Sequence, residues 1–186
     1  MKLFGSYTSP YVRHCRIVLA HLHKDFQFIP TDHAQSAEQS PTKRVPFLQD
    51  DAVMLYDSSS IIRYLREQQQ QGFCDSVEDF DLFCMVNTAL DATVNVFLLE
   101  RDGITGEHSP YVVRQQQRVQ AILNELNQRE WPLAGPYTDG QLRLACFLSW
   151  AQFRERINLG DYVQLQQFLR ALNSQPWFAN THPALN

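Results

Sequence analysis

The pattern of apolar residues changes once along this chain, near residue 75, and this change constrains the fold more than any other feature. Before it, the pattern reads strand, helix, strand, loop, two strands and helix; after it, the spacing is helical throughout. Four consecutive glutamines at 68–71 and a polar stretch to Ser76 predict a linker, although glutamine would also allow the preceding helix to continue. We therefore expect a mixed α/β domain over residues 1–75 and an all-helical domain over residues 77–186.

The expected elements follow from local spacing and from cap residues. In the first half, we expect strands at 2–5, 25–28, 47–49 and 53–56, helices at 10–23 and from 58, and a loop with at most one helical turn over 31–44. In the second half, we expect helices at 77–101, from 110, from 139 and at 161–172. Thr138 and Gln141 have the spacing of a capping box for the third of these helices. The stripe expected to be buried on the first of them consists of Phe80, Phe83, Leu90, Val94 and Phe97.

Composition excludes several classes of partner. The chain of 186 residues is 44% hydrophobic, which is enough for a packed core, and its net charge of −4 without a basic block argues against nucleic acid and acidic membranes. It lacks an N-terminal signal segment, and no uninterrupted apolar run approaches the ~18 residues of a membrane span, so we expect a cytoplasmic protein. The four cysteines are scattered without a C-x-x-C motif and are expected to be reduced. His21 and His23 are two residues apart, so on a helix they point to different faces and cannot share a metal. We expect the other four histidines at the solvated surface and expect no metal site; they are His14, His33, His108 and His182.

Ser9 stands where the first strand gives way to the first helix. Pro10 suits the first position of that helix, and Ser9 suits the N-cap before it. A helix N-terminus is electropositive and rich in unpaired N–H groups, so it can hold an anion or a thiolate. A single Ser-Pro pair is, however, most often only a helix cap.

Five segments in the right order give this motif more weight. They are residues 5–13 (GSYTSPYVR), 44–48 (RVPFL), 57–62 (DSSSII), the capping box at 138–141 and residues 177–183 (WFANTHP). Together with an all-helical second half, they resemble the glutathione S-transferase family, and most closely its bacterial and plant-type serine members. The resemblance covers nearly the whole chain. It implies an N-terminal thioredoxin-like domain, a C-terminal α-helical domain and a homodimer.

The resemblance also assigns a glutathione site. It implies a cis peptide bond between Val45 and Pro46, which would present the backbone of Val45 to the cysteine of glutathione. Ser58, at a helix N-terminus, would bind the γ-glutamyl carboxylate, and Asp57 would help to balance the ammonium group. Arg44 would pair with the glycyl carboxylate. Each motif also has a plain structural interpretation, as an edge-strand proline, a helix cap or a solvated arginine.

The identity of residue 9 limits the chemistry. Related thioredoxin-type proteins that act on disulfides have a cysteine there, whereas here Ser9 offers no thiol and Cys15 lies almost two turns inside the helix. Disulfide reduction and covalent glutathione adducts are therefore not expected. By resemblance, Ser9 donates a hydrogen bond to the glutathione sulfur and favours its thiolate. Thr8 and Ser6 remain alternatives for this role, and Tyr7 is less suited to it.

The second substrate is expected between the two domains, where Tyr11, Asn87, Asp91 and Phe153 are candidates by position. Core packing is the alternative role for Tyr11 and Phe153, and a satisfied buried amide is the alternative for Asn87. The implied function is a detoxification-type transferase that uses glutathione as co-substrate, without a cofactor, against a small electrophile or a peroxide. The alternative is a non-catalytic protein that keeps the scaffold for binding other proteins. The sequence does not decide which electrophile is used.

Overall fold

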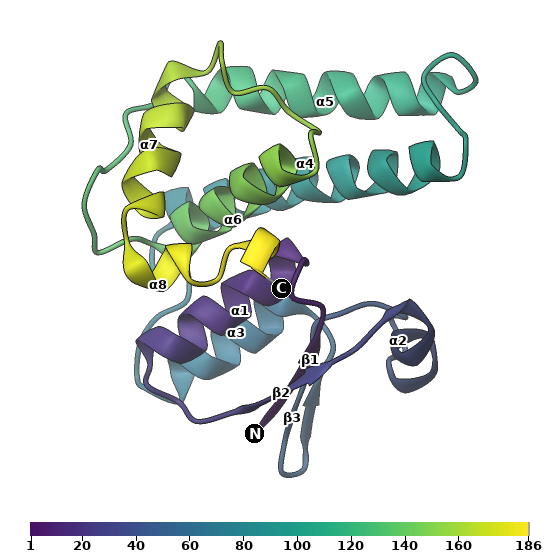
Figure 1. Ribbon diagram of the computed structural model, residues 1–186. Coiled ribbons are helices and arrows are strands. Elements are labelled where there is room, and N and C mark those ends of the chain that lie inside the picture. Colours follow the sequence, from purple (N-terminus) through teal and green to yellow (C-terminus); the bar gives the residue numbers. More distant parts are fainter. Residues whose placement is uncertain (186) are drawn as a thin grey trace. The chain divides into compact units, whose positions relative to one another are not determined.

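The computed structural model describes residues 1–185, which form two compact units (Figure 1). The first unit comprises Met1–Asp75 together with the C-terminal segment from Gln175, and the second comprises Ser76–Ser174. These units are defined by contacts within the chain and do not show which parts fold independently. The division into domains at 1–75 and 77–186 therefore stays a prediction. The two units are described separately below.

The first unit is built on a four-stranded mixed sheet. Its strands are β1 (Lys2–Gly5), β2 (Gln27–Pro30), β3 (Phe47–Asp50) and β4 (Val53–Leu55), in the order β2-β1-β3-β4. β1 pairs parallel with β2, and β3 pairs antiparallel with both β1 and β4. A parallel pair needs a crossover, and α1 (Pro10–His21) supplies it. β2 begins two residues later than the sequence predicts; the other three strands lie where they are expected to within one residue.

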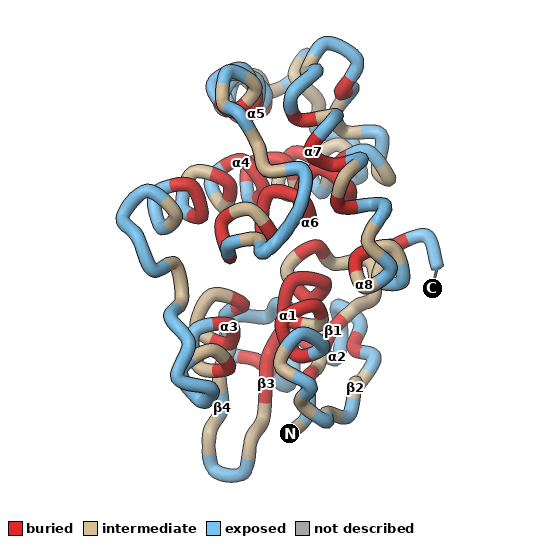
Figure 2. The backbone as a smooth tube through the Cα atoms, turned by 90° about the vertical axis from the view of Figure 1, so that its left-hand side faces the viewer, coloured by how far each residue is buried: buried red, intermediate tan, exposed pale blue. Residues whose placement is uncertain are grey.

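The core of this unit lies between the sheet and two helices. α1 packs against α3 (Ser58–Glu67), and both helices contribute fully buried residues to one hydrophobic cluster (Figures 1 and 2). Leu3 and Leu48 enter this cluster from β1 and β3. The fold class expected for the N-terminal half, an α/β thioredoxin-like domain, is confirmed.

The expected loop over residues 31–44 contains a helix, α2 (His33–Gln39). The Asp32 side chain accepts a hydrogen bond from the Gln35 N–H (2.8 Å), and the Gln35 side chain accepts one from the Asp32 N–H (3.0 Å). The expectation of a loop was wrong because α2 has no apolar face to reveal its period. Its start signal, an acidic residue followed three positions later by Gln, is nevertheless present in the sequence.

The C-terminal segment packs on the first unit, whereas the sequence placed it with the helical half. It contains α8 (Pro176–Ala179) and the short 3-10 helix η1 (Pro183–Leu185). Arg13 of α1, which is 1% exposed, donates to the Phe178 carbonyl (2.8 Å) and to Thr181 Oγ1 (3.0 Å). Its guanidinium also lies 3.8 Å from the centre of the Phe178 ring. A buried arginine with these contacts is not apparent from residue spacing, so this attachment could not be predicted from the sequence.

The second unit is entirely helical, as expected. It consists of α4 (Val77–Arg101), α5 (Pro110–Leu126), α6 (Asp139–Phe153) and α7 (Val163–Asn173). α4 packs against both α5 and α6, and α6 also contacts α7. α6 is buried along most of its length (Figure 2). The predicted capping box at its start is confirmed, since Thr138 and Gln141 satisfy each other's backbone N–H groups.

The buried face of α4 agrees only in part with the predicted stripe. Phe83 and Leu90 are buried as expected, whereas Phe80 is 52% exposed. The buried positions also include Leu82, Val86, Ala89 and Val96. α4 is apolar around most of its circumference and is covered by two neighbouring helices. One narrow stripe therefore does not contain all of its buried residues.

The length and composition of α4 bear on the expectation that no segment spans a membrane. Among the described residues, it is the one helix whose length and composition would allow it to cross a membrane, with an 18-residue window of mean hydropathy 1.6 that is 44% buried. This is weak evidence for a span, because the core helix of a folded helical unit has the same composition.

Candidate functional site

Ser9 caps α1 in the way the sequence predicts. Its Oγ accepts a hydrogen bond from the Val12 N–H (3.3 Å), and Pro10 occupies the first turn. The residue is half-buried. Among residues 1–185, the Ser9 hydroxyl proton has no acceptor. Ser9 therefore combines a solvent-accessible O–H donor with the N-terminus of a 12-residue helix.

The neighbouring hydroxyl groups are engaged differently. Ser6 Oγ and Thr8 Oγ1 lie 3.1 Å apart and share a hydrogen bond, and Ser6 Oγ also accepts from the Thr8 N–H (3.4 Å). Tyr7 packs its ring on Phe28, with the centroids 4.3 Å apart. The hydrogen bond that Ser6 and Thr8 share uses only one of their two hydroxyl protons, so both residues stay alternatives to Ser9 as a donor to a ligand.

Arg16 is a feature of this region that the sequence reasoning missed. Its guanidinium lies 4.8 Å from the centre of the Tyr7 ring and 5.6 Å from that of Phe28. Its Nη1 is buried without a hydrogen-bond acceptor among the described residues. Burial lowers the pKa of Arg16, and the nearby Tyr7 opposes that shift. The Tyr7 ring therefore packs against both Phe28 and the Arg16 guanidinium, and these contacts stabilise its position.

The peptide bond between Val45 and Pro46 is cis, as predicted. Val45 is half-buried and Pro46 is buried, directly before β3. Arg44 precedes them and is exposed. The structure therefore places these three residues as a continuous segment at the start of an inner strand of the sheet.

Asp57 and Ser58 lie at the N-terminus of α3. Asp57 is the N-cap, and its Oδ1 accepts a hydrogen bond from the Ser59 N–H (2.7 Å). Ser58 is 4% exposed, and its carbonyl oxygen lies 3.9 Å from the Sγ of Cys15 in α1. Since α1 and α3 pack together, the two helices that begin after Ser9 and Asp57 belong to one rigid layer.

The four candidates for the second substrate are divided between the units. Tyr11 belongs to the first unit, and Asn87, Asp91 and Phe153 belong to the second. Asn87 Oδ1 is buried without a hydrogen-bond donor among residues 1–185, whereas Asp91 is exposed. The guanidinium of Arg154 lies 5.0 Å from the centre of the Phe153 ring. The roles of these four residues remain predictions.

One histidine contradicts the expectation of a solvated surface. His14 is fully buried in α1, because it faces inward next to the buried Arg13 and Cys15. Among the described residues, no three His, Cys, Asp or Glu side chains lie together as metal ligands. All four cysteines are free of disulfides, and Cys15 is buried.

Comparison with known proteins shows what this chain is similar to. Residues 3–72 match the family model of the glutathione S-transferase N-terminal domain. The whole fold resembles the glutathione S-transferase of Methylobacillus flagellatus KT with GSH bound (TM-score 0.84, 22% identity, 98% of both chains covered). It also resembles one from Methylobacterium radiotolerans JCM 2831 in complex with glutathione sulfonate (TM-score 0.83, 21% identity, 98% of this chain and 94% of that one).

A third solved structure points the same way. A glutathione transferase family member from Pseudomonas fluorescens Pf-5 with bound S-(propanoic acid)-glutathione has a TM-score of 0.81 at 22% identity, over 98% of this chain and 99% of that one. No curated protein matches the sequence. Residues 3–72 therefore match the glutathione S-transferase N-terminal domain, and the chain as a whole has the fold of the solved glutathione S-transferases. The resemblance inferred from the five sequence segments is confirmed.

Proposed function

We propose that the protein is a glutathione transferase that binds reduced glutathione on its first unit and activates the thiol for attack on a small electrophile or a peroxide. The observation that carries this proposal is the state of Ser9. Its oxygen already accepts the Val12 N–H, while its proton is left without an acceptor among the described residues, at the N-terminus of α1. A sulfur atom that approaches Ser9 Oγ would complete this hydrogen bonding.

The two ends of glutathione match the remaining residues of the site. The γ-glutamyl carboxylate suits the Ser58 hydroxyl and the electropositive start of α3, and the Asp57 carboxylate would balance the ammonium group. The backbone of Val45 would pair with the cysteine of glutathione. Arg44, which is exposed, would pair with the glycyl carboxylate. Two of the similar structures hold GSH and glutathione sulfonate, which supports glutathione binding by this fold.

Thiol activation requires a modest free energy. A thiol with a pKa of about 8.5 is only about 3% ionised at pH 7. A decrease of about 2 units would make it roughly 75% thiolate and corresponds to about 2.7 kcal/mol of preference for the charged form. A hydrogen bond from a neutral donor to a charged acceptor contributes about 1.5–3 kcal/mol, so the Ser9 hydroxyl with the α1 N-terminus is sufficient.

The reaction then follows from the thiolate. Its proton leaves to solvent, its sulfur forms a bond to an electrophilic carbon, and the leaving group departs with its electron pair. With a peroxide, the sulfur attacks oxygen and the O–O bond breaks. Tyr11, Asn87, Asp91 and Phe153 are the candidates to contact the second substrate. We expect a homodimer that needs glutathione as co-substrate and no further cofactor.

Calorimetric titration with reduced glutathione at pH 6.5 and pH 8 tests the proposal. We expect saturable binding at one site per chain, with about 0.5 proton released to buffer at pH 6.5 and about 0.7 at pH 8 for a thiol pKa that falls by about 2 units. Ser9→Ala should still bind glutathione but lose conjugation of an electrophilic probe, whereas Thr8→Val should retain both. If millimolar glutathione does not bind, the proposal fails, and a scaffold that binds other proteins becomes the better account.

A further inference from the structure

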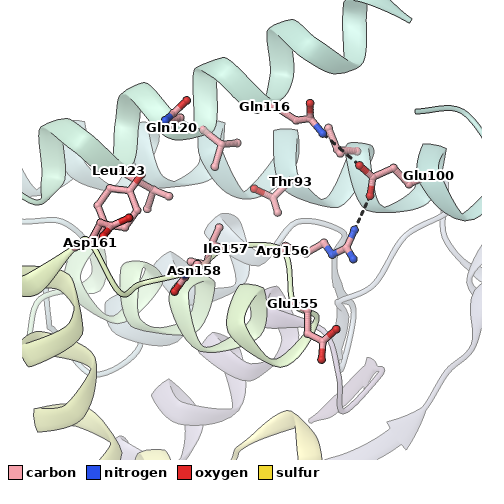
Figure 3. A pocket seen from close by; sticks show the side chains of 13 residues that line it. Thr93, Glu100, Gln116, Gln120, Leu123, Glu155, Arg156, Ile157, Asn158 and Asp161 are labelled. Atoms are coloured by element: carbon pink, nitrogen blue, oxygen red, sulfur yellow. Dashed lines mark hydrogen bonds and ion pairs between the residues drawn. The ribbon is translucent and has the colours of Figure 1, made fainter. Parts of the chain in front are cut away.

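The helical unit contains a cavity of about 420 Å³ that none of the proposed glutathione or second-substrate residues lines (Figure 3). It is formed by the C-terminal half of α4, by α5 and by the chain that follows α6. Its location within one compact unit makes it a site separate from the chemistry of Ser9.

Part of the cavity lining is apolar. Val96, Val119, Leu123 and Ile157 line it. The Thr93 hydroxyl donates to the Ala89 carbonyl within α4 (2.7 Å), so its proton is not available to a ligand. This part of the cavity therefore suits a hydrocarbon or aromatic body rather than a polar one.

One end of the cavity is occupied by an internal ion pair. Arg156 Nη1 lies 2.5 Å from Glu100 Oε2, and Gln116 Nε2 donates to Glu100 Oε1 (3.3 Å), as the dashed lines in Figure 3 show. Arg156 Nε also donates to the Arg154 carbonyl (2.7 Å), and its guanidinium lies 5.6 Å from the centre of the Phe97 ring. The only guanidinium that lines this cavity is thus held in place and neutralised by Glu100.

The opposite end carries an uncompensated negative charge. Asp161 lies there, across Thr93 and Ile157 from the Glu100–Arg156 pair (Figure 3). Its carboxylate is exposed and has no ion-pair partner within residues 1–185. Gln120 lies towards the same end and can offer an amide oxygen. The Asn158 side-chain oxygen is already engaged, because it accepts the Gly160 N–H (2.9 Å).

The charges that line the cavity are therefore unbalanced. Three carboxylates and one cation line the cavity; they are Glu100, Glu155 and Asp161, and Arg156. Figure 3 shows the Glu155 side chain directed away from the other lining residues. An anionic ligand would meet a guanidinium already paired with Glu100 and would be repelled by Asp161. A cation with an apolar body would instead match both the Asp161 carboxylate and the apolar part of the lining.

We propose that this cavity binds an amphipathic organic monocation, a primary amine carried on an aryl-alkyl chain. The ammonium group lies against Asp161, with the Gln120 amide oxygen as a second acceptor. The body packs against Leu123 and Ile157, and its far end reaches towards the Glu100–Arg156 pair. The proposal is independent of whether Ser9 activates glutathione.

Three probes with the same body and different charge test this assignment. 4-Phenylbutylamine, 4-phenylbutanol and 4-phenylbutyrate are each titrated calorimetrically into the full chain at low salt. We expect saturable binding of one amine per chain, weaker binding of the alcohol and the weakest binding of the carboxylate. Added salt should weaken the amine, because Asp161 is exposed and its field is screened over about 10 Å at 0.1 M.

Variants at Asp161 give the sharper readout. Asp161→Asn should weaken the amine about three- to fivefold, the size of an exposed ion pair, and Asp161→Lys should make the carboxylate probe bind in preference to the amine. Asp81→Asn removes an equally exposed carboxylate outside the cavity and should bind as the unmodified chain does. Melting temperatures verify that each variant folds. The proposal is overturned if all three probes bind equally, if the amine does not saturate at millimolar concentration, or if Asp161→Lys leaves the order of affinities unchanged.

Discussion

The start of α6 depends on a carboxylate from another helix, which makes Asp79 a sensitive position for stability. Asp79 Oδ1 accepts hydrogen bonds from the Gly140 N–H (3.2 Å) and from the Thr138 hydroxyl, and so places a negative charge at the N-terminus of the buried α6. Gln141, the local member of the capping box, is neutral. The Asp79 carboxylate of α4 therefore supplies a negative charge that complements the positive end of the α6 dipole.

The size of the effect can be worked out from these contacts. Asp79→Ala removes two hydrogen bonds to a half-exposed charged acceptor, together about 1.5–3 kcal/mol, and a favourable charge at a helix terminus, about 0.3–1 kcal/mol. We expect a loss of about 2–4 kcal/mol, or about 5–12 °C in melting temperature for a chain of this length. Asp79→Asn keeps an acceptor and should lose about 1 kcal/mol, or about 2–4 °C.

Thermal unfolding followed by circular dichroism measures these differences. Asp81→Ala is the matched control, because Asp81 is an exposed carboxylate two residues further along α4. It should melt within about 1 °C of the unmodified chain, as surface substitutions usually do. If Asp79→Ala melts no lower than this control, the carboxylate does not stabilise α6 and the reasoning is refuted.

Three further substitutions test packing and pH dependence in the first unit. Gly5→Ala would place a Cβ 2.6 Å from Val12 Cγ1 and should cost about 1–3 kcal/mol in urea unfolding, with part of the loss recovered in the double variant with Val12→Ala; additive losses would contradict this. Arg13→Met removes the buried donor to the Phe178 carbonyl and should cost about 2–4 kcal/mol and speed proteolysis of the C-terminal segment, whereas unchanged proteolysis would mean that Arg13 does not hold it. Burial, assisted by the charge of Arg13, lowers the pKa of His182, so the unfolded chain binds a proton first as the pH falls below about 6.5. Stability should therefore be lost as the pH falls from about 7 towards the lowered folded pKa, and His182→Gln should flatten this dependence of the melting temperature; an equal slope in both proteins would rule it out.

The parts of the fold that sequence predicted well are those with explicit start and stop signals. α4 begins and ends where it was expected, because Ser76 caps its first turn and Gly103, at φ +82°, follows its end. The cap of α1 by Ser9 and the capping box of α6 are local in the same sense, since partners three residues apart satisfy each other.

The parts that sequence could not predict depend on partners distant in the chain. Which side of α4 is buried is decided by α5 and α6 together, and the attachment of the C-terminal segment is decided by Arg13, 165 residues from Phe178. The cavity near Asp161 combines three elements, so no spacing rule identifies it. Among the candidate site residues, the caps could be predicted, but the free donor of Ser9 required the structure.

The most direct test of the central claim is the pKa of the glutathione thiol when bound. Ultraviolet absorbance of the thiolate can be titrated from about pH 5 to about pH 9 with saturating protein, for the unmodified chain, for Ser9→Ala and for Ser9→Thr, which keeps the hydroxyl. The account predicts a bound pKa about 2 units below that of free glutathione, a return of about 1–2 units in Ser9→Ala, and little change in Ser9→Thr. A bound thiol that titrates like free glutathione, or identically with and without the Ser9 hydroxyl, would contradict it.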